Sequence, residues 1–394
     1  MSGSRLKSGD RIAVLGAGLL GTCISLLAAR SGLRVTLFDA QPAPMSRAGR
    51  WNEGKIHQGY IYMADNTLAT AKRLLPGARN FDRIVSSVIE TSIREKITRE
   101  PDILLIHADS VVAPGDAYRY LQAVWSLSRE AGFATTPPEQ LSERQLRAIT
   151  ENPSVVAAYT TPENSIDTNW VADRLVERIR SEGRIEGRFG ERVTNVVFNG
   201  SDWSVVTNKG AAEGFDAIVN ALWEGRPAID AARGLLSPLL SYRYRMSVFA
   251  QVDACNLPNF VIATGPFGDF KNYGDSLYLS WYPAGLIVDE FACYPPTDPR
   301  VSTEGKFAIQ NQTLSALSEF IPDIANLREA ARDWNVQGGW VVARGKGSLS
   351  DVRSGLHKRD SFGIQQMDSY FSVDAGKYSM APLLAEQTVD QLMN

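Results

Sequence analysis

The sequence is poor in cysteine and histidine and has no long apolar run, and each scarcity excludes a class of protein. Its three cysteines, Cys23, Cys255 and Cys293, are an odd number without a C-x-x-C pair, which is not typical of a disulfide framework. No apolar stretch approaches about 18 residues without a charge or a glycine, so we expect no transmembrane helix. The first eleven residues are polar and contain no signal-peptide core. We therefore expect a reduced, cytoplasmic protein.

Signals for several other chemistries are also missing. The net charge of −3 offers no overall electrostatic attraction for nucleic acid or for an anionic membrane. No spacing of histidine and cysteine indicates a metal site, so none is expected. Neither a Gly-x-Ser-x-Gly nucleophile elbow nor a P-loop is present. The composition is otherwise that of an ordinary globular protein.

Residues 12–39 contain the most informative pattern in the chain. A short apolar strand runs into Gly16-x-Gly18-x-x-Gly21, an apolar helix follows, and a second strand ends at Asp39. Gly16 permits a tight turn, Gly18 lets a pyrophosphate approach the backbone, and Gly21 lets the helix pack on the sheet. Asp39 follows at about the 20-residue spacing of a carboxylate that binds a ribose hydroxyl. The pattern predicts a dinucleotide site; it leaves NAD and FAD open, while the acid argues against NADP.

The chain length and the later strands predict two domains, because 394 residues are too many for one compact core. Aromatic and β-branched runs at residues 242–252, 260–264 and 276–282 indicate an antiparallel sheet. The C-terminus then returns to a strand, a turn and a helix. We predict an α/β, Rossmann-like cofactor domain built from residues 1–90, 151–236 and 336–394. The substrate domain, with a mainly antiparallel sheet, takes residues 91–150 and 237–335.

One segment of the first domain is assigned from local signals alone. Residues 66–75 have the apolar spacing of a helix, and Pro76-Gly77 is expected to end it. The short apolar run at residues 84–89 is then expected to form a buried strand.

Three further segments resemble one flavoprotein family. Residues 52–62 resemble the Asn-x-Gly-x-Ile-His-x-Gly-x-x-Tyr loop of L-2-hydroxyglutarate dehydrogenases and the Lys-Leu-Ile-His-Gly-Gly loop of flavin glycerol-3-phosphate dehydrogenases. Residues 375–379 resemble the Gly-Gly-Lys-Leu-Thr-Thr loop of the latter. Residues 216–223 resemble an Asp-x-Val-Val-Asn-Ala-Ala-Gly-x-Trp segment near the cofactor. With the glycine turn and in this order, they make the chain similar to FAD-dependent oxidoreductases of the D-amino-acid oxidase superfamily.

The resemblance implies FAD as the cofactor. Some relatives attach the flavin through a histidine or a cysteine, but no cysteine lies near the C-terminal loop, so we expect non-covalent FAD. The cofactor-binding residues expected from the glycine turn and the matching segments are Gly16, Gly18, Leu19, Leu20, Gly21, Asp39, Asn52, Gly54, Lys55, Ile56, His57, Val193, Ala221, Leu222, Gly376, Lys377 and Tyr378.

The expected catalytic residues are His57, Lys377 and Arg353. A neutral imidazole at His57 would accept the proton of a substrate hydroxyl or amine as the hydride leaves; a structural role, in which it packs on the cofactor, stays open. Lys377 lies shortly before a helix with Pro382 in its first turn, where positive charge would stabilise a flavin anion. A surface lysine capping a loop is the alternative. Arg353 falls where relatives place an arginine near the active site.

Substrate recognition is expected from the second domain. Arg243 and Arg245 alternate on one strand and share a face, as do Tyr278, Ser280 and Tyr282 on a later strand. An arginine on such a face would pair with a substrate carboxylate, although a solvated polar face is equally compatible. The expected substrate-binding residues are Tyr60, Arg243, Arg245 and Tyr282.

The sequence also departs from its relatives at two positions. Ile61 stands where the glycerol-3-phosphate enzymes have an arginine, which argues against recognition of a phosphate ester. Leu222 and Trp223 replace Ala-Gly in the middle segment. The loop that they form therefore lacks the backbone freedom of the family's glycine.

We therefore expect an FAD-dependent oxidoreductase. It would remove a hydride from the carbon that bears the amine or hydroxyl of a small polar substrate, such as an amino acid or a hydroxy acid. The expected partners are that substrate and an electron acceptor, oxygen or another; no nucleic acid is expected, and the oligomeric state is left open. The alternatives are an FAD-binding protein of this fold with a structural or non-redox role, an NAD(H)-dependent enzyme, and a flavin monooxygenase.

Overall fold

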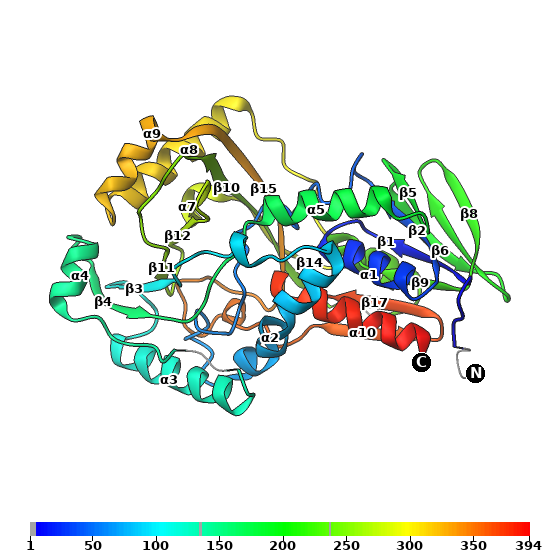
Figure 1. Ribbon diagram of the computed structural model, residues 1–394, viewed down its shortest axis with the longest axis horizontal. Helices are drawn as coiled ribbons and strands as arrows, with labels where there is room; N and C mark the ends of the chain where they lie inside the picture. Colours follow the sequence, from blue (N-terminus) through cyan, green and yellow to red (C-terminus); the bar gives the residue numbers. More distant parts are fainter. Residues whose placement is uncertain (1–4, 134–135, 236–237) are drawn as a thin grey trace.

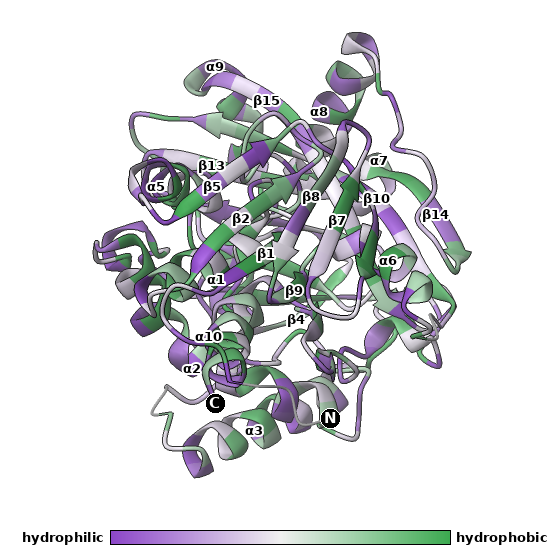
Figure 2. Cartoon of the chain, turned by 90° about the vertical axis from the view of Figure 1, so that its right-hand side faces the viewer, coloured by the Kyte–Doolittle hydropathy of each residue, from purple (hydrophilic) through white to green (hydrophobic). Residues whose placement is uncertain are grey.

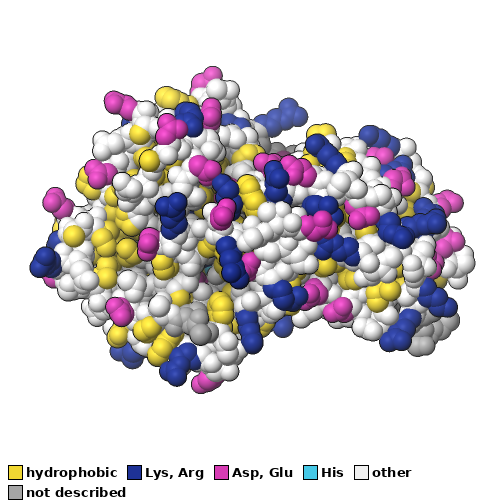
Figure 3. Space-filling model, viewed as in Figure 1, with side chains coloured by type: hydrophobic (Ala, Val, Ile, Leu, Met, Phe, Trp, Pro, Cys, Tyr) yellow, Lys and Arg dark blue, Asp and Glu magenta, His cyan; other side chains and the backbone are white. Residues whose placement is uncertain are grey.

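The computed structural model describes residues 5–133, 136–235 and 238–394 (Figure 1). The predicted domain boundary between residues 236 and 237 lies outside these residues. Lys, Arg, Asp and Glu side chains are interspersed over the face shown in Figure 3, as the small net charge suggests. Within the described ranges, no helix has both the length and the apolar character needed to cross a membrane.

A six-stranded sheet is assembled from distant parts of the chain, in the order β16-β17-β9-β1-β2-β5. Its pairs are parallel except for the antiparallel hairpin of β16 and β17. The strands are β1 (Arg11–Leu15), β2 (Arg34–Asp39), β5 (Ile185–Phe189), β9 (Ala217–Asn220), β16 (Gly363–Met367) and β17 (Tyr370–Asp374). This sheet has the predicted Rossmann-like character, and it joins N-terminal, central and C-terminal segments.

Alternate residues of β1 pack in two different hydrophobic cores, one on each face of the sheet. This follows because successive side chains of a strand point to opposite faces. Ile12 and Val14 pack with the helices on one face, whereas Ala13 and Leu15 pack with a small three-stranded sheet on the other. Helices α1 and α10 lie side by side on the first face (Figures 1 and 2). That face carries α1 (Leu19–Arg30), α2 (Ala69–Ile89), α5 (Thr168–Ser181) and α10 (Ala381–Met393); the small sheet comprises β6 (Val193–Phe198), β7 (Trp203–Thr207) and β8 (Gly210–Phe215).

An eight-stranded, mainly antiparallel sheet forms the second part, as predicted, in the order β14-β10-β13-β12-β11-β3-β4 with β15 paired to β10. Only β3 and β11 are parallel among its described pairs. Its strands are β3 (Ile103–His107), β4 (Val155–Thr160), β10 (Leu240–Gln251), β11 (Phe260–Ala263), β12 (Gly268–Asn272), β13 (Ser276–Trp281), β14 (Leu286–Ala292) and β15 (Arg332–Arg344). The remaining helices are α3 (Pro114–Glu130), α4 (Glu143–Ile149), α6 (Arg226–Ala232), α7 (Tyr282–Gly285), α8 (Thr303–Ser318) and α9 (Leu327–Ala330).

The sheet pairing crosses two of the predicted domain boundaries. Strand β4 and the whole of β15 pair within the eight-stranded sheet, although residues 151–236 and 336–394 were assigned to the cofactor domain. Neither strand contains a local sequence pattern that indicates which of the two sheets it joins. The division into two domains therefore stays a prediction, while the pairing of these strands is a structural finding.

Helix α2 corrects the local assignment around Pro76. Residues 69–89 form one helix with Pro76 inside it, so the predicted break and the predicted strand at residues 84–89 are both wrong. Ile84, Val85 and Val88 are buried on one helix face, which is the 3.6-residue period misread as a short strand. Gly77, the residue after the proline, packs closely against the C-terminal segment. A Cβ there would lie only 2.8 Å from the Ser379 carbonyl oxygen.

Candidate functional site

A cavity of about 630 Å³ lies between the two sheets and joins most of the predicted segments. One part of its wall comes from the glycine turn, the end of β2 and the loop after β9. The other part comes from the His57 loop, strands β10, β13 and β15, and the turn after β17. Its volume is within the usual range for a site that encloses a small organic molecule.

The three glycines of the first turn have three different surroundings. Gly16 has φ +98°, and a Cβ there would lie 2.7 Å from the Ala221 carbonyl oxygen. A Cβ on Gly21 would lie within bonding distance of the Gly16 carbonyl oxygen, at 1.8 Å. A Cβ on Gly18 would meet nothing within 4 Å, because this residue faces the cavity. The turn is thus closed by packing on two sides and open at Gly18.

The open side presents a helix N-terminus and a carboxylate, groups of the kind that suit a phosphate and a ribose hydroxyl. Gly18 is the N-cap of α1; it supplies no side-chain cap, and no acidic residue lies in the first turn, so the helix N-terminus attracts an anion. Asp39 accepts the N–H groups of Ala17 and Gln41, both at 2.7 Å, and lines the cavity. Burial raises the pKa of Asp39, and these hydrogen bonds oppose the rise.

The His57 side chain is almost completely buried, at 1% exposed, and faces the other end of the cavity. Its Nε2 lies 3.8 Å from Glu53 Oε1. Its Nδ1 is buried and has no hydrogen-bond partner among the described residues. Burial and the positive charges of Lys377 and Lys55 lower the pKa of His57 well below its usual value. The imidazole is therefore neutral and has a nitrogen available to a ligand.

The loop that carries His57 is held from behind by buried charges. Glu163 Oε1 accepts the N–H groups of Gln58 and Gly59, at 2.6 and 2.9 Å. Lys55 and Lys271 both bind the carboxylate of Asp102, the latter at 2.7 Å. Burial and the neighbouring Lys271 lower the pKa of Lys55 to about 7. Lys55, expected to bind the cofactor, thus anchors the loop instead of lining the cavity.

Positive charge gathers at the His57 end of the cavity. Lys377 lines it, with Nζ 5.6 Å from the ring centre of Tyr62. Arg245 lines it from β10, and its guanidinium lies 4.6 Å from the ring centre of Tyr282. Burial opposes ionisation of Glu53, yet Lys377 and Arg245 hold its pKa below the usual value. This end therefore combines a neutral imidazole, one carboxylate and several cations.

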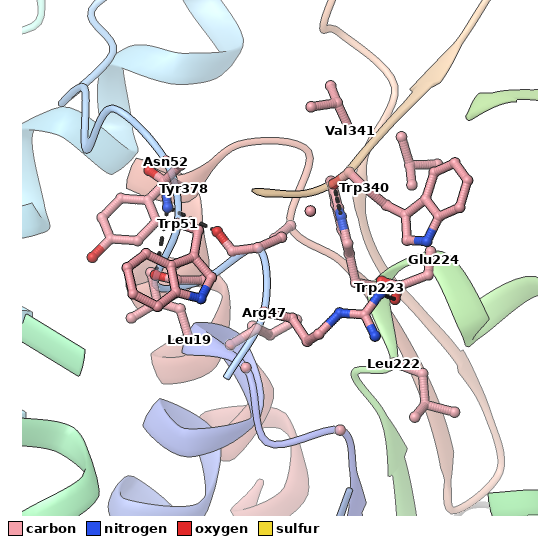
Figure 4. Close-up of a pocket in the computed structure, with 18 of the residues that line it drawn as sticks. Leu19, Arg47, Trp51, Asn52, Leu222, Trp223, Glu224, Trp340, Val341 and Tyr378 are labelled. Carbon is pink, nitrogen blue, oxygen red and sulfur yellow. Dashed lines mark hydrogen bonds and ion pairs between the residues drawn. The ribbon is translucent and has the colours of Figure 1, made fainter. Parts of the chain in front are cut away.

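The middle of the cavity contains residues that the sequence did not indicate. Arg47 extends across it toward Glu224 in Figure 4, with Trp51 on one side and Trp223 on the other. Arg47 forms two hydrogen bonds of 2.7 Å with Asp298. Burial raises the pKa of Glu224 to about 7. Arg47 and Trp51 come from irregular segments and Glu224 from the short 3₁₀ helix Trp223–Gly225, and no sequence spacing indicates that these residues belong to the site.

The backbone of residues 222–225 accommodates Leu222 and Trp223, which replace Ala-Gly of the resembling segment. Trp223 adopts φ +54°, a conformation that favours glycine and that costs energy for other residues. Its indole N–H donates to the Trp340 carbonyl oxygen at 2.8 Å, and the Trp340 indole N–H donates to Asp298 at 2.7 Å. Trp223 thus adopts a conformation that favours glycine, although the sequence predicted a loop without the backbone freedom of glycine.

The structure brings most of the predicted site residues to the cavity. Those that line it are Gly16, Gly18, Leu19, Leu20, Asp39, Asn52, His57, Ala221, Leu222, Arg245, Gly376, Lys377 and Tyr378. Those that do not line it but lie in segments beside or behind it are Gly21, Gly54, Lys55, Ile56, Tyr60, Arg243 and Tyr282. The cavity wall also includes Ser247, Tyr278, Trp340 and Arg359, which were not among the predicted binding residues.

Two predicted residues lie elsewhere. Val193 begins β6 in the three-stranded sheet, whose packing turns it away, and its neighbour Arg192 lines the cavity instead. Arg353 is exposed and pairs with Asp351 two residues earlier, at 3.1 Å, which holds it in a surface turn. Arg353 therefore does not line the cavity and does not contact its His57 end.

Comparison with known proteins agrees with this arrangement. The family model described as FAD dependent oxidoreductase, or DAO, matches residues 11–349. Glycine oxidase from Geobacillus kaustophilus superposes with a TM-score of 0.69 at 17% identity, covering 97% of this chain and 95% of that one. L-Amino acid deaminase from Proteus vulgaris gives 0.67 at 13% identity, covering 100% and 96%. At such identities the likeness concerns the fold alone.

A curated relative matches a smaller part of the chain. Kynurenine 3-monooxygenase from Salinispora tropica is 29% identical over 144 residues, which are 33% of this chain and 32% of that protein. The chain thus matches about a third of the length of this relative.

Proposed function

The chain belongs to the FAD-dependent oxidoreductase family DAO, and from this premise we propose that it oxidises a small carboxylate-bearing substrate at the carbon that bears an amine or hydroxyl group. Membership confirms the predicted family, the enzyme class and FAD as the cofactor. The observation that carries the proposal is the single cavity that connects the glycine turn with His57, Lys377 and Arg245.

The residues present fit FAD at both ends of the cavity. Gly18 leaves space for a pyrophosphate, and the uncapped N-terminus of α1 attracts its charge. At the other end, the buried Nδ1 of His57 lacks a partner among the described residues. When bound, FAD supplies the acceptor for the substrate hydride. The scarcity of cysteine supports a reducing compartment, and the cytoplasm stays the proposed location.

The chain's own residues divide the remaining work. Arg245 pairs with a substrate carboxylate and orients the substrate beneath β10 and β13. His57 accepts the proton of the substrate amine or hydroxyl, and Glu53, 3.8 Å from its Nε2, stabilises the resulting imidazolium. Lys377 stabilises negative charge that develops on the cofactor side.

Replacing Gly18 with valine should remove the cofactor without unfolding the protein. Gly18 has φ −75° and ψ −172°, an extended backbone that any residue adopts, and its Cβ would point into the cavity. We expect G18V to lose FAD affinity by at least about tenfold, because the side chain occupies the approach of the pyrophosphate. The measurement is the Kd of FAD for the apoprotein, by quenching of flavin fluorescence.

Gly183 provides the matched control for this prediction. A Cβ there would also meet nothing within 4 Å, but Gly183 does not line the cavity. G183V should bind FAD as the unmodified protein does. Unchanged FAD affinity in G18V would contradict the assignment of the glycine turn.

The proposed reaction is tested by anaerobic mixing of the holoenzyme with two panels, amino acids or amines and the corresponding 2-hydroxy acids. Bleaching of the flavin spectrum by members of one panel identifies the reacting group. Amine substrates are favoured by the structural neighbours, a glycine oxidase and an L-amino acid deaminase. Hydroxyl substrates are favoured by the neutral His57 beside Glu53, because a hydroxyl proton needs a base. No bleaching by either panel would overturn the proposal.

Hydroxylation is the second candidate reaction, and the partial match to a kynurenine 3-monooxygenase supports it. A monooxygenase of that class takes its electrons from a nicotinamide cofactor, whereas the proposed reaction takes them from the substrate. We expect NADH and NADPH to leave the flavin oxidised in the absence of oxygen. Rapid reduction by either would favour hydroxylation instead.

A further inference from the structure

Three arginines converge on Tyr282 at the edge of the cavity. Arg243 Nη1 donates to the Tyr282 hydroxyl at 3.0 Å, and the Arg245 guanidinium lies over the Tyr282 ring. Arg359 follows the short 3₁₀ turn Gly355–His357, is 9% exposed, and interacts electrostatically with Arg243 and Tyr282. We call Arg243, Arg245 and Arg359 the arginine cluster. It is built from β10 and from a loop distant in the sequence.

No carboxylate of the described residues lies within ion-pair distance of the arginine cluster; Glu53 and Asp374 interact with it only from farther away. Its hydrogen bonds within the described ranges go to Tyr282, to Ser280 at 3.4 Å, and to the carbonyl oxygens of Leu356 and Lys358. The Nε atoms of all three arginines are buried without a partner in the described ranges. Burial, together with the neighbouring Arg243, lowers the pKa of Arg359 to about 10. The fold therefore concentrates positive charge here without an ion-paired carboxylate among the described residues.

Other buried cations of the chain form ion pairs with buried carboxylates. Lys271 binds Asp102, and Arg226 binds Asp230 at 2.7 Å. Two acids that interact electrostatically with the arginine cluster are already engaged: Asp374 accepts from Arg226 at 3.1 Å, and Glu53 faces Lys377 as well as Arg245. Because burial of an unpaired charge is costly, a cluster left without partners indicates that a ligand supplies them.

Two members of the cluster reach the cavity from different directions. Arg245 and Arg359 both line it, whereas Arg243 lies behind them. Arg245 projects from β10, and Arg359 comes from the loop that also borders a smaller second cavity of about 200 Å³. A guanidinium binds a carboxylate through paired N–H donors, so two separate guanidiniums suit two carboxylates better than one compact anion.

Resting on the proposed function, we propose that the substrate is a dicarboxylate, namely a small amino or hydroxy acid with a second carboxylate on its side chain. Arg245 binds the carboxylate next to the reacting carbon, and Arg359 binds the distal one. Arg243 adds positive charge to both and fixes the hydroxyl of Tyr282. The cluster thereby excludes substrates with apolar or cationic side chains.

The test measures binding to the holoenzyme without turnover. Succinate and glutarate are titrated against the monocarboxylates butyrate and valerate of matching length, and inorganic phosphate forms a separate arm. The readout is the change in the visible flavin spectrum. We expect each dicarboxylate to bind at least about tenfold more tightly than its monocarboxylate partner and than phosphate. Equal affinities, or tighter binding of phosphate, would overturn the proposal.

Variants assign the effect to the cluster. R359M should reduce the preference for dicarboxylates to less than about threefold, and R359K should retain part of it. R245Q provides a second variant in case R359M does not fold. R144M is the control, because Arg144 is exposed on α4 and lies outside both cavities. A preference that survives in both R359M and R245Q would contradict the assignment.

Substrate reduction separates this proposal from the proposed function. If monocarboxylic amino or hydroxy acids reduce the flavin as fast as dicarboxylic ones, the dicarboxylate proposal fails and the proposed function stands. If dicarboxylates bind selectively but no amino or hydroxy acid reduces the flavin, the proposed function fails and the binding assignment stands.

Discussion

Replacing His57 with alanine should slow reduction of the flavin by substrate about 10²- to 10⁴-fold, the usual contribution of a positioned general base. The imidazole is buried at the reacting end of the cavity, and burial and nearby cations hold it neutral. H57N keeps a polar side chain of similar size and should be slowed to a similar extent, because an amide does not accept the proton. The measurement is the anaerobic reduction rate at saturating substrate.

The pH dependence follows from the lowered pKa of His57. Because the imidazole stays neutral until the pH falls well below its usual pKa of about 6.5, the reduction rate should show no acidic limb centred there. H107N is the control, since His107 lies at the end of β3 and does not line the cavity. If H57A reduces the flavin as fast as the unmodified protein, His57 is not the base and has only a structural role.

Replacing Asp102 with asparagine should destabilise the protein by about 3–5 kcal/mol, the cost of removing one partner from a buried ion pair. Asp102 is 1% exposed and binds both Lys55 and Lys271, which are equally buried. The asparagine leaves two ammonium groups facing each other, with Glu163 3.9 Å from Lys55. Urea unfolding followed by circular dichroism measures the loss.

The loss in D102N should depend on pH in a defined direction. The pKa of Lys55 is lowered to about 7 in the folded state and is near 10.5 in the unfolded chain. The penalty is therefore largest below pH 7, where folded Lys55 carries the charge that Asp102 compensates, and it shrinks as the pH rises through 7, because the folded lysine then loses its proton. D116N, which removes a surface ion pair with Arg119, should cost less than about 1 kcal/mol. An equally small loss in D102N would show that the buried charges do not hold the His57 loop.

The parts of the fold that the sequence predicts are those with local causes. The glycine turn follows from Gly16 and Gly18, whose backbone and missing side chains determine what can approach. The two sheets follow from their periods and from the aromatic strands, and the C-terminal strand returns to the first sheet as expected. The predicted helix break at Pro76 failed because packing against the C-terminal segment outweighs local propensity there.

The parts of the site that the sequence does not reveal depend on contacts between distant segments. Arg47 enters the cavity because Asp298, 251 residues later, binds it. Arg359 belongs to the site because its loop packs beside β10 residues more than a hundred positions earlier. Lys55 lies in a loop that resembles a cofactor-binding motif, yet its ammonium group binds Asp102 and does not line the cavity. Spacing along the chain contains no information about these partners.

We propose that the cavity end beneath β10 and β13, which His57 and Lys377 line, receives the flavin ring, and that the glycine turn binds the opposite half of the cofactor. A crystal structure of the FAD-bound protein measures this directly. The account predicts that the isoalloxazine ring contacts His57 and the C-terminal turn at Gly376 and Lys377, with the pyrophosphate at Gly18. A ring placed at Asp39, or a ring that makes no contact with His57, would contradict it.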